Sequence, residues 1–130
     1  MAQNSAKVEN LDEISKVRPS RPIDLVHLAK QCLGDEHLEY EILRLFDTTM
    51  KIYMERLQAS EAQADIVMNL HAIKGAASGV GAWTIADQAK ACEDELHADR
   101  PLTPERIADL GMAVEEVGTF ITRMLSNEPA

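Results

Sequence analysis

The stretch of sequence that decides the fold is Leu70-His71-Ala72-Ile73-Lys74-Gly75-Ala76-Ala77-Ser78-Gly79-Val80-Gly81-Ala82. Positions three, four and seven residues apart share one face of an α-helix. One such row consists of His71, Lys74, Gly75 and Ser78. A second row, about 100° away around the helix, is apolar and consists of Ile66, Leu70, Ile73 and Ala77. The pattern predicts a helix that buries the apolar row and holds His71 beside the core, facing outward.

The composition indicates one acidic domain. The chain has 130 residues and a formal net charge of -9, which fits a single domain with its own core. It lacks the positive surface that nucleic acids or anionic membranes require. Cys32 and Cys92 fall within apolar helical patterns and are expected as buried, reduced thiols. Because the sequence shows no signal-peptide core and no long uninterrupted apolar segment, we expect a cytoplasmic protein.

Residues 1–19 are polar and end beside Pro19 and Pro22, so we expect a flexible N-terminal arm. A weak helix remains open there, because apolar residues recur at a spacing of three: Val8, Leu11, Ile14 and Val17. Pro22 is expected to open a short helix that ends at about Leu33, before Gly34. Its inward residues are expected to be Leu25, Leu28 and Cys32.

A long helix is expected over residues 36–59, with Asp35 as its N-cap. Its expected buried seam steps by four and three residues and consists of Leu38, Ile42, Leu45, Thr49 and Ile52, widened by Phe46, Tyr53 and Leu57. Ser60 and Gln63 match a capping box, which places the start of the helix that carries His71 just after Ser60. Gly79 and Gly81 are expected to break that helix.

Two more helices are expected, over residues 83–98 and from Thr103-Pro104-Glu105 to about residue 126. Short connections require neighbouring helices to run antiparallel. The sequence therefore predicts an all-α fold over residues 20–126, an up-down-up-down antiparallel four-helix bundle with an additional short N-terminal helix. Residues 127–130 are expected to form a frayed C-terminal tail.

The predicted hairpin of helices brings further side chains to the level of His71. Residues equidistant from the turn lie at the same height, and the midpoint between residues 71 and 93 is residue 82, within the predicted turn. Glu93 should therefore stand level with His71, and Lys90 level with Lys74. One stripe of the helix over residues 83–98 consists of Ala86, Lys90, Glu93 and His97.

Three short motifs carry a resemblance to a known family: His71-x-x-Lys74-Gly75, Gly81-Ala82 and Cys92-Glu93. With them the chain resembles the histidine-containing phosphotransfer (HPt) domain over about residues 22–125. Residues ahead of the histidine match the start of that family's long second helix: Gly34-Asp35, Leu38, Leu43 and Phe46. Leu70 is a departure, since the family often has a small residue before the histidine.

The resemblance implies reversible phosphoryl transfer, with the phosphoryl group carried on the outer ring nitrogen of His71. It implies that the chain accepts this group from a receiver-domain aspartyl phosphate and passes it to another response-regulator receiver domain in a phosphorelay. The expected partners are receiver domains of response regulators and a hybrid sensor histidine kinase, which would bring Mg²⁺ with them. We expect no cofactor or metal on this chain itself, and a monomer.

The chemistry of such a transfer suggests a role for each neighbour of His71. A neutral imidazole is a nucleophile near neutral pH, since free histidine has a pKa of about 6.5. Glu93 would accept a hydrogen bond from the inner N–H and so orient the imidazole. Lys74 would stabilise the charge of the phosphoryl oxygens, and Gly75 would permit close approach of the donor. Further candidates for the phosphoryl neighbourhood are Ser78 and Lys90.

Other functions remain open at this point. The chain has neither the length nor the glycine-rich loop of an ATP-binding kinase, so we expect no autokinase activity. An HPt-like adaptor or inhibitor would bind a receiver or kinase without phosphotransfer, although the intact set of His71, Lys74 and Gly75 argues against it. A metal-binding helical bundle is suggested by Glu93 and His97, four residues apart, but the paired Glu-x-x-His motifs of di-iron bundles are absent. The remaining candidates, His27, His37, Trp83, Cys92 and the methionines, are interpreted as solvated or packing residues.

Overall fold

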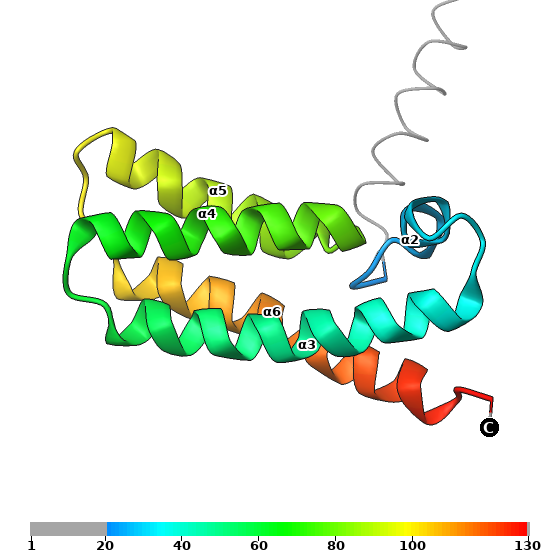
Figure 1. Cartoon of the computed structure of the whole chain (residues 1–130). Helices are drawn as coiled ribbons and strands as arrows, with labels where there is room; N and C mark the ends of the chain where they lie inside the picture. The colour runs from blue at the N-terminus through cyan, green and yellow to red at the C-terminus, as the bar shows by residue number, and fades with distance from the viewer. Residues whose placement is uncertain (1–20, 130) are drawn as a thin grey trace, which may run out of the picture.

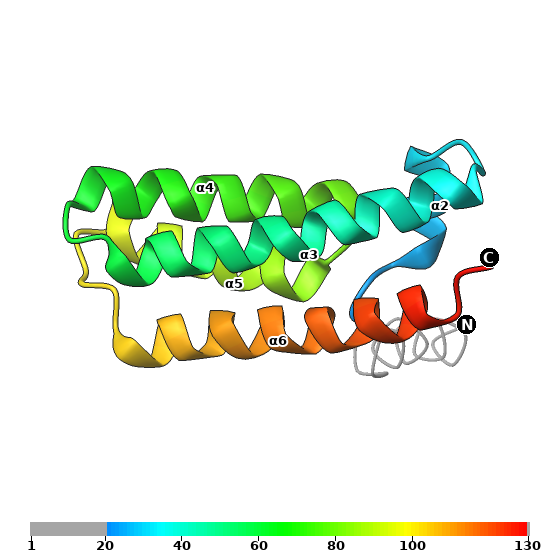
Figure 2. The same ribbon diagram turned by 60° about the horizontal axis from the view of Figure 1, so that its bottom comes forward.

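The computed structural model describes residues 21–129, within which it contains five α-helices and no strand. Figure 1 labels them α2 (Leu25–Gln31), α3 (Glu36–Ala59), α4 (Gln63–Val80), α5 (Trp83–His97) and α6 (Pro104–Ser126). The four long helices form a ring in which α3 and α5 each pack against both α4 and α6. Helix α2 lies across one end of this bundle (Figures 1 and 2). The predicted all-α bundle with an additional short helix is confirmed.

The predicted N-terminal arm, residues 1–19, lies outside the described residues. At the other end, the backbone turns after α6, and the Glu128 side chain forms an ion pair with Arg44 of α3. Fraying of residues 127–130 therefore stays a prediction. None of the helices that the structure describes is long and apolar enough to cross a membrane.

Helix α2 begins later than predicted. Asp24 is its N-cap, and the Asp24 carboxylate accepts a hydrogen bond from the His27 backbone N–H at 3.1 Å. Pro22 therefore precedes the helix and does not open it. The helix ends at Gln31, because Leu33 and Gly34 adopt left-handed φ angles of 53° and 77°, which a right-handed helix cannot continue.

The central line of the face of α3 that we predicted to be buried is wrong, although Phe46 and Leu57, which we predicted to widen that face, are buried. Leu38, Leu45 and Ile52 are exposed, by 41%, 67% and 43%. The buried seam instead contains the following residues: Tyr40, Leu43, Phe46, Met50, Met54 and Leu57. Both series have helical spacing, so the period alone does not say which one faces inward. The packing of α3 between α4 and α6 selects the second series and leaves the first as an apolar stripe on the surface.

The predicted capping box at the start of α4 is also wrong. The N-cap is Ala62, which makes no side-chain cap hydrogen bond. Ser60 instead ends α3, where its hydroxyl donates to the Arg56 carbonyl at 2.6 Å. Gly79 lies within α4, and only Gly81, with a φ of 85°, terminates the helix. The expected caps of α3 and α6, Asp35 and Thr103, are both observed.

Helix α2 is fastened to the turn between α4 and α5. The Asp24 backbone N–H donates to the Gly81 carbonyl at 2.9 Å, and Trp83 Nε1 donates to the Asp24 carboxylate at 3.0 Å. A Cβ on Gly81 would lie 3.0 Å from the Asp24 Cβ, so this close approach requires glycine. Trp83, expected only as packing, is 43% exposed and serves as the donor in this contact. We call the contact among Asp24, Gly81 and Trp83 the α2 latch.

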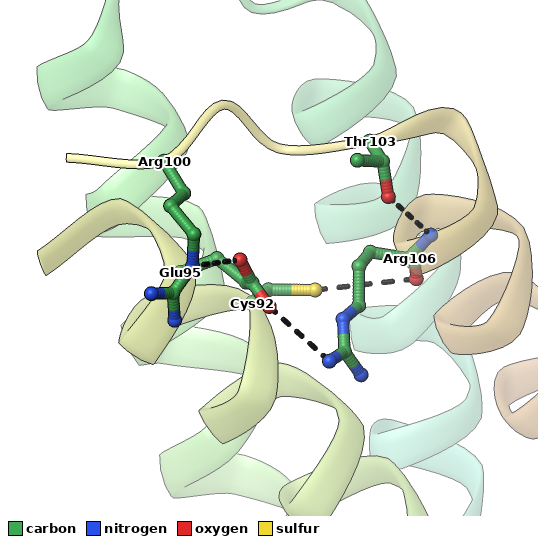
Figure 3. Close-up of polar contacts among 5 residues, drawn as sticks. All are labelled: Cys92, Glu95, Arg100, Thr103 and Arg106. Atoms are coloured by element: carbon green, nitrogen blue, oxygen red, sulfur yellow. Dashed lines mark hydrogen bonds and ion pairs between the residues drawn. The ribbon is translucent and has the colours of Figure 1, made fainter. Parts of the chain in front are cut away.

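The connection from α5 to α6 is held by charges that the sequence analysis did not anticipate (Figure 3). The Glu95 carboxylate pairs with Arg100 at 2.6 Å and with Arg106 at 3.2 Å. The hydrogen bond from Arg100, with a further contribution from Arg106, lowers the pKa of Glu95. The Arg106 backbone N–H also donates to the Thr103 hydroxyl, which caps α6. These contacts fix the end of α5 against the start of α6.

The buried interior lies where the apolar helix faces meet. Both predicted thiols, Cys32 and Cys92, are 1% exposed or less and unpaired by disulfide. Burial raises the pKa of each of them, so they are poor nucleophiles. In α4 the predicted seam is observed, with Leu70, Ile73 and Ala77 fully buried. This burial fixes the rotation of α4 and thereby the direction in which His71 points.

Candidate functional site

His71 lies on the exposed face of α4, one residue after the fully buried Leu70. The side chain of His71 is 73% exposed. A helix rotates by about 100° per residue, so burial of Leu70 and Ile73 turns His71 outward beside the core. The imidazole points outward, as the sequence predicted. A partner can reach the ring without any opening of the bundle.

Glu93, from the adjacent helix α5, lies level with His71 as the sequence predicted. Its side chain is 7% exposed, and it is the only charged residue among the buried residues of the described chain. Glu93 Oε2 lies 3.7 Å from His71 Nδ1. That distance is too long for a direct hydrogen bond, so the role of Glu93 as acceptor of the inner N–H stays a prediction.

Lys74 approaches the same carboxylate from one turn further along α4. Lys74 Nζ lies 3.1 Å from Glu93 Oε1, and its side chain is 32% exposed. The two groups form an ion pair at close distance, although the Glu93 Oε1 atom lacks the geometry of a directed hydrogen bond. The sequence analysis placed Lys74 near the phosphoryl group but missed its pairing with Glu93. The signal was available, because the predicted hairpin brings both stripes together.

Gly75 and Ser78 continue the row of α4 that carries His71. Gly75 is exposed, and a Cβ there would meet nothing within 4 Å. Ser78 is half-buried. Lys90 does not join the cluster, because its exposed ammonium pairs with Asp94 at 3.1 Å. Its proposed contribution to the phosphoryl neighbourhood therefore needs a change of side-chain conformation.

The other histidines lie in different surroundings. His37 and His97 are exposed, at the start of α3 and the end of α5. His27 is half-buried, and its ring lies edge-on to Trp83 with centroids 4.9 Å apart. Over residues 21–129, no three side chains of His, Cys, Asp or Glu gather as metal ligands would. The pairing of Glu93 with Lys74 also directs its carboxylate toward an ammonium rather than toward His97.

Comparisons with known proteins agree with this geometry. The family model described as the Hpt domain matches residues 41–120, a range that contains His71, Lys74 and Glu93. Among solved structures, the chain is similar to the HPT domain of a sensor hybrid histidine kinase from Shewanella, with a TM-score of 0.73 and 19% sequence identity. That match covers 85% of this chain and 98% of the other. No curated protein matches the chain. Because the family model covers more than half of the sequence, the chain belongs to the Hpt domain family, whose members are phosphotransfer intermediates of two-component phosphorelays.

Proposed function

We propose that this chain accepts a phosphoryl group from the aspartyl phosphate of one receiver domain onto His71 and passes it to a second receiver domain. The observation that carries the proposal is the exposed imidazole of His71 beside the buried carboxylate of Glu93 and the ammonium of Lys74. Each step moves one phosphoryl group. The His71 Nε2 lone pair forms the N–P bond, the aspartyl O–P bond breaks, and its electron pair stays on the aspartate.

The orientation of the imidazole supports attack through Nε2. Nδ1 faces Glu93 at 3.7 Å, so the other ring nitrogen is the one available to a visiting group. A carboxylate near Nδ1 favours the tautomer that keeps the proton there, which leaves the Nε2 lone pair free. Positive charge on Lys74 then stabilises the phosphoryl oxygens once they are bound to the ring. Glu93 thus acts as a positioning residue, and Lys74 stabilises charge.

Exposed apolar side chains on α3 and α4 would provide a place for a receiver domain to bind. Lys51, Met54 and Glu55 of α3 share a hollow with α6, so the opposite flank of α3 is the one nearer to α4. That flank carries the stripe that the sequence analysis expected in the core: Leu38, Leu45 and Ile52. On α4 the exposed side chain of Met68 lies one turn before His71. We name these four residues the α3–α4 apolar surface.

The partner domains would supply the other groups that the reaction needs. The acidic residues and Mg²⁺ that phosphoryl transfer from aspartate uses would belong to the receiver domains, including that of a hybrid sensor kinase. This chain would act without autokinase activity, without a cofactor of its own and as a monomer in the cytoplasm. It supplies the nucleophile and the surface around it. The direction of net flow follows from which receiver is phosphorylated.

A transfer experiment tests the proposal. A receiver domain labelled with radioactive phosphate at its aspartate should transfer the label to this chain, in a form that is labile to acid and stable to alkali. His71→Gln should abolish uptake while the helical circular dichroism signal is unchanged. His97→Gln, which removes another exposed histidine, is the matched control and should accept label normally. Label on the His71→Gln variant would disprove the site, and receiver binding without any labelling would instead indicate an adaptor.

A further inference from the structure

The buried carboxylate of Glu93 lies between two side chains of α4. Glu93 Oε1 is 3.1 Å from Lys74 Nζ, whereas Glu93 Oε2 is 3.7 Å from His71 Nδ1. The close pair in this structure is therefore Lys74–Glu93, and the imidazole is the more distant neighbour. The ammonium expected to stabilise a phosphoryl group is held by another anion before that group arrives.

Burial makes this pairing hard to give up. A carboxylate that is 7% exposed loses most of its hydration, and such a group is destabilised when its cation is removed. A neutral imidazole N–H is a weaker partner than an ammonium. Lys74 can therefore leave Glu93 only when another positive group replaces it at the carboxylate. Phosphorylation of the ring creates such a group.

We propose that phosphorylation of His71 exchanges ion pairs: Lys74 moves from Glu93 to the phosphoryl oxygens, and Glu93 pairs with the N–H of the newly charged ring. This inference rests on the proposed function. When the neutral ring attacks through Nε2, it keeps its proton on Nδ1 and gains a positive charge, while the phosphoryl group brings two negative charges. After the exchange, each charge again has a neighbour of opposite sign.

The surroundings of His71 favour Lys74 as the cation that moves. It is one turn from His71 on the same helix, where side chains three residues apart are neighbours, and its partly exposed four-carbon stem is free to rotate. On α5, Lys90 is paired with Asp94, and His97 is exposed at the end of the helix. On α3, Arg56 lines a hollow with Met68 and Asn69 of α4.

The exchange predicts that Glu93 acts more strongly on the phosphorylated ring than on the free one. The pKa of the His71 ring is measured by NMR titration, before and after phosphorylation of the protein with phosphoramidate. Glu93→Gln should lower that pKa in both states, with a shift at least about twice as large in the phosphorylated state. In the Lys74→Gln background, the two shifts should become equal. Lys90→Gln removes the same charge from α5 and should leave the difference intact.

Equal shifts in the two states of the otherwise native protein would overturn the exchange, because they would show that Lys74 stays on Glu93. The unphosphorylated protein gives a second measurement. There, Lys74→Gln should enlarge the shift caused by Glu93→Gln, and no enlargement overturns the inference even if phosphoramidate leaves His71 unmodified. Phosphoramidate needs no partner domain. Failure of transfer from receivers, with the pKa pattern intact, would therefore disprove the proposed function and not the exchange.

Discussion

Packing within the described chain does not explain why residue 75 is a glycine. It lies one turn after His71 on the exposed row, and a Cβ there would meet nothing within 4 Å. Glycine inside a helix costs about 0.5–1 kcal/mol relative to alanine. The structure thus carries this cost without any gain in packing among the described residues. Close approach of a partner to His71, as we propose, would account for it.

Gly75→Gln should therefore leave the fold intact and slow phosphotransfer. We expect an unchanged or higher Tm, and a transfer rate from a phosphorylated receiver lower by at least about tenfold, because small displacements of reacting atoms cost orders of magnitude in rate. Ala108→Gln places the same side chain on an exposed position of α6 and serves as the control. A transfer rate for Gly75→Gln equal to that of the control would contradict this role.

The sequence placed some side chains of the site well and others poorly, for a physical reason. The midpoint of a helical hairpin fixes height along the axis, so the level of Glu93 relative to His71 could be predicted. Height does not fix where a long flexible side chain ends. Lys90 pairs with Asp94, four residues on, as adjacent positions on a helix surface commonly do, and Lys74 takes the buried carboxylate instead.

Among the helices, α3 shows where periodicity stops being informative. Its apolar residues populate more than half of the helix circumference, so two stripes satisfy the same period. The choice between them depends on long-range packing against α4 and α6, which no local pattern encodes. The sequence signals for helix N-termini show the same limit. Thr103 caps α6 as predicted, whereas Ser60 bonds backward to Arg56, because the end of α3 competes for the same hydroxyl.

The side-chain part of the α2 latch should weaken in acid. The hydrogen bond from Trp83, and then that from the His27 backbone, hold the pKa of Asp24 below its ordinary value of 3.8. A carboxyl whose pKa is depressed on folding adds stability above its unfolded pKa, and this contribution is lost as the pH falls through the folded value. We expect the side-chain contact between Asp24 and Trp83 to weaken as the pH falls below 3.8, while the buried Ile23 and Leu28 keep α2 on the bundle. Fluorescence of Trp83, the only tryptophan, reports the change.

Two variants separate this local event from general acid unfolding. Asp24→Asn removes the titrating group and should abolish the acid transition in Trp83 fluorescence. Asp35→Asn alters the corresponding N-cap of α3. Asp35 takes no part in the α2 latch, so this variant should keep the transition. The same acid transition in Asp24→Asn as in the native chain would show that another group controls the latch.

For the molecule as a whole, the α3–α4 apolar surface should determine how tightly receivers bind. Full burial of a Leu or Ile side chain is worth about 1.5–3 kcal/mol, and each 1.4 kcal/mol is about a factor of ten in Kd. Leu45→Ser or Ile52→Ser should therefore raise the Kd for a receiver domain about tenfold, measured by titration calorimetry. The Tm should change little, since both side chains are exposed.

Met112→Ser is the matched control for these variants. Met112 is 64% exposed, but it belongs to α6, where it lines a hollow with α3 on the flank away from α4. Its removal should leave receiver binding unchanged. If Met112→Ser weakens binding and Leu45→Ser does not, the receiver docks on the opposite side of the bundle.

The pairing of Glu128 with Arg44 has a practical consequence for handling the molecule. It holds the chain after α6 against α3, at the end of the bundle where α2 also lies (Figure 2). A fluorophore, surface tether or fused protein attached after α6 would project from this end of the bundle, whereas His71 lies along the flank of α4. Sensor chips and single-molecule assays can therefore anchor the domain by its tail without masking the imidazole.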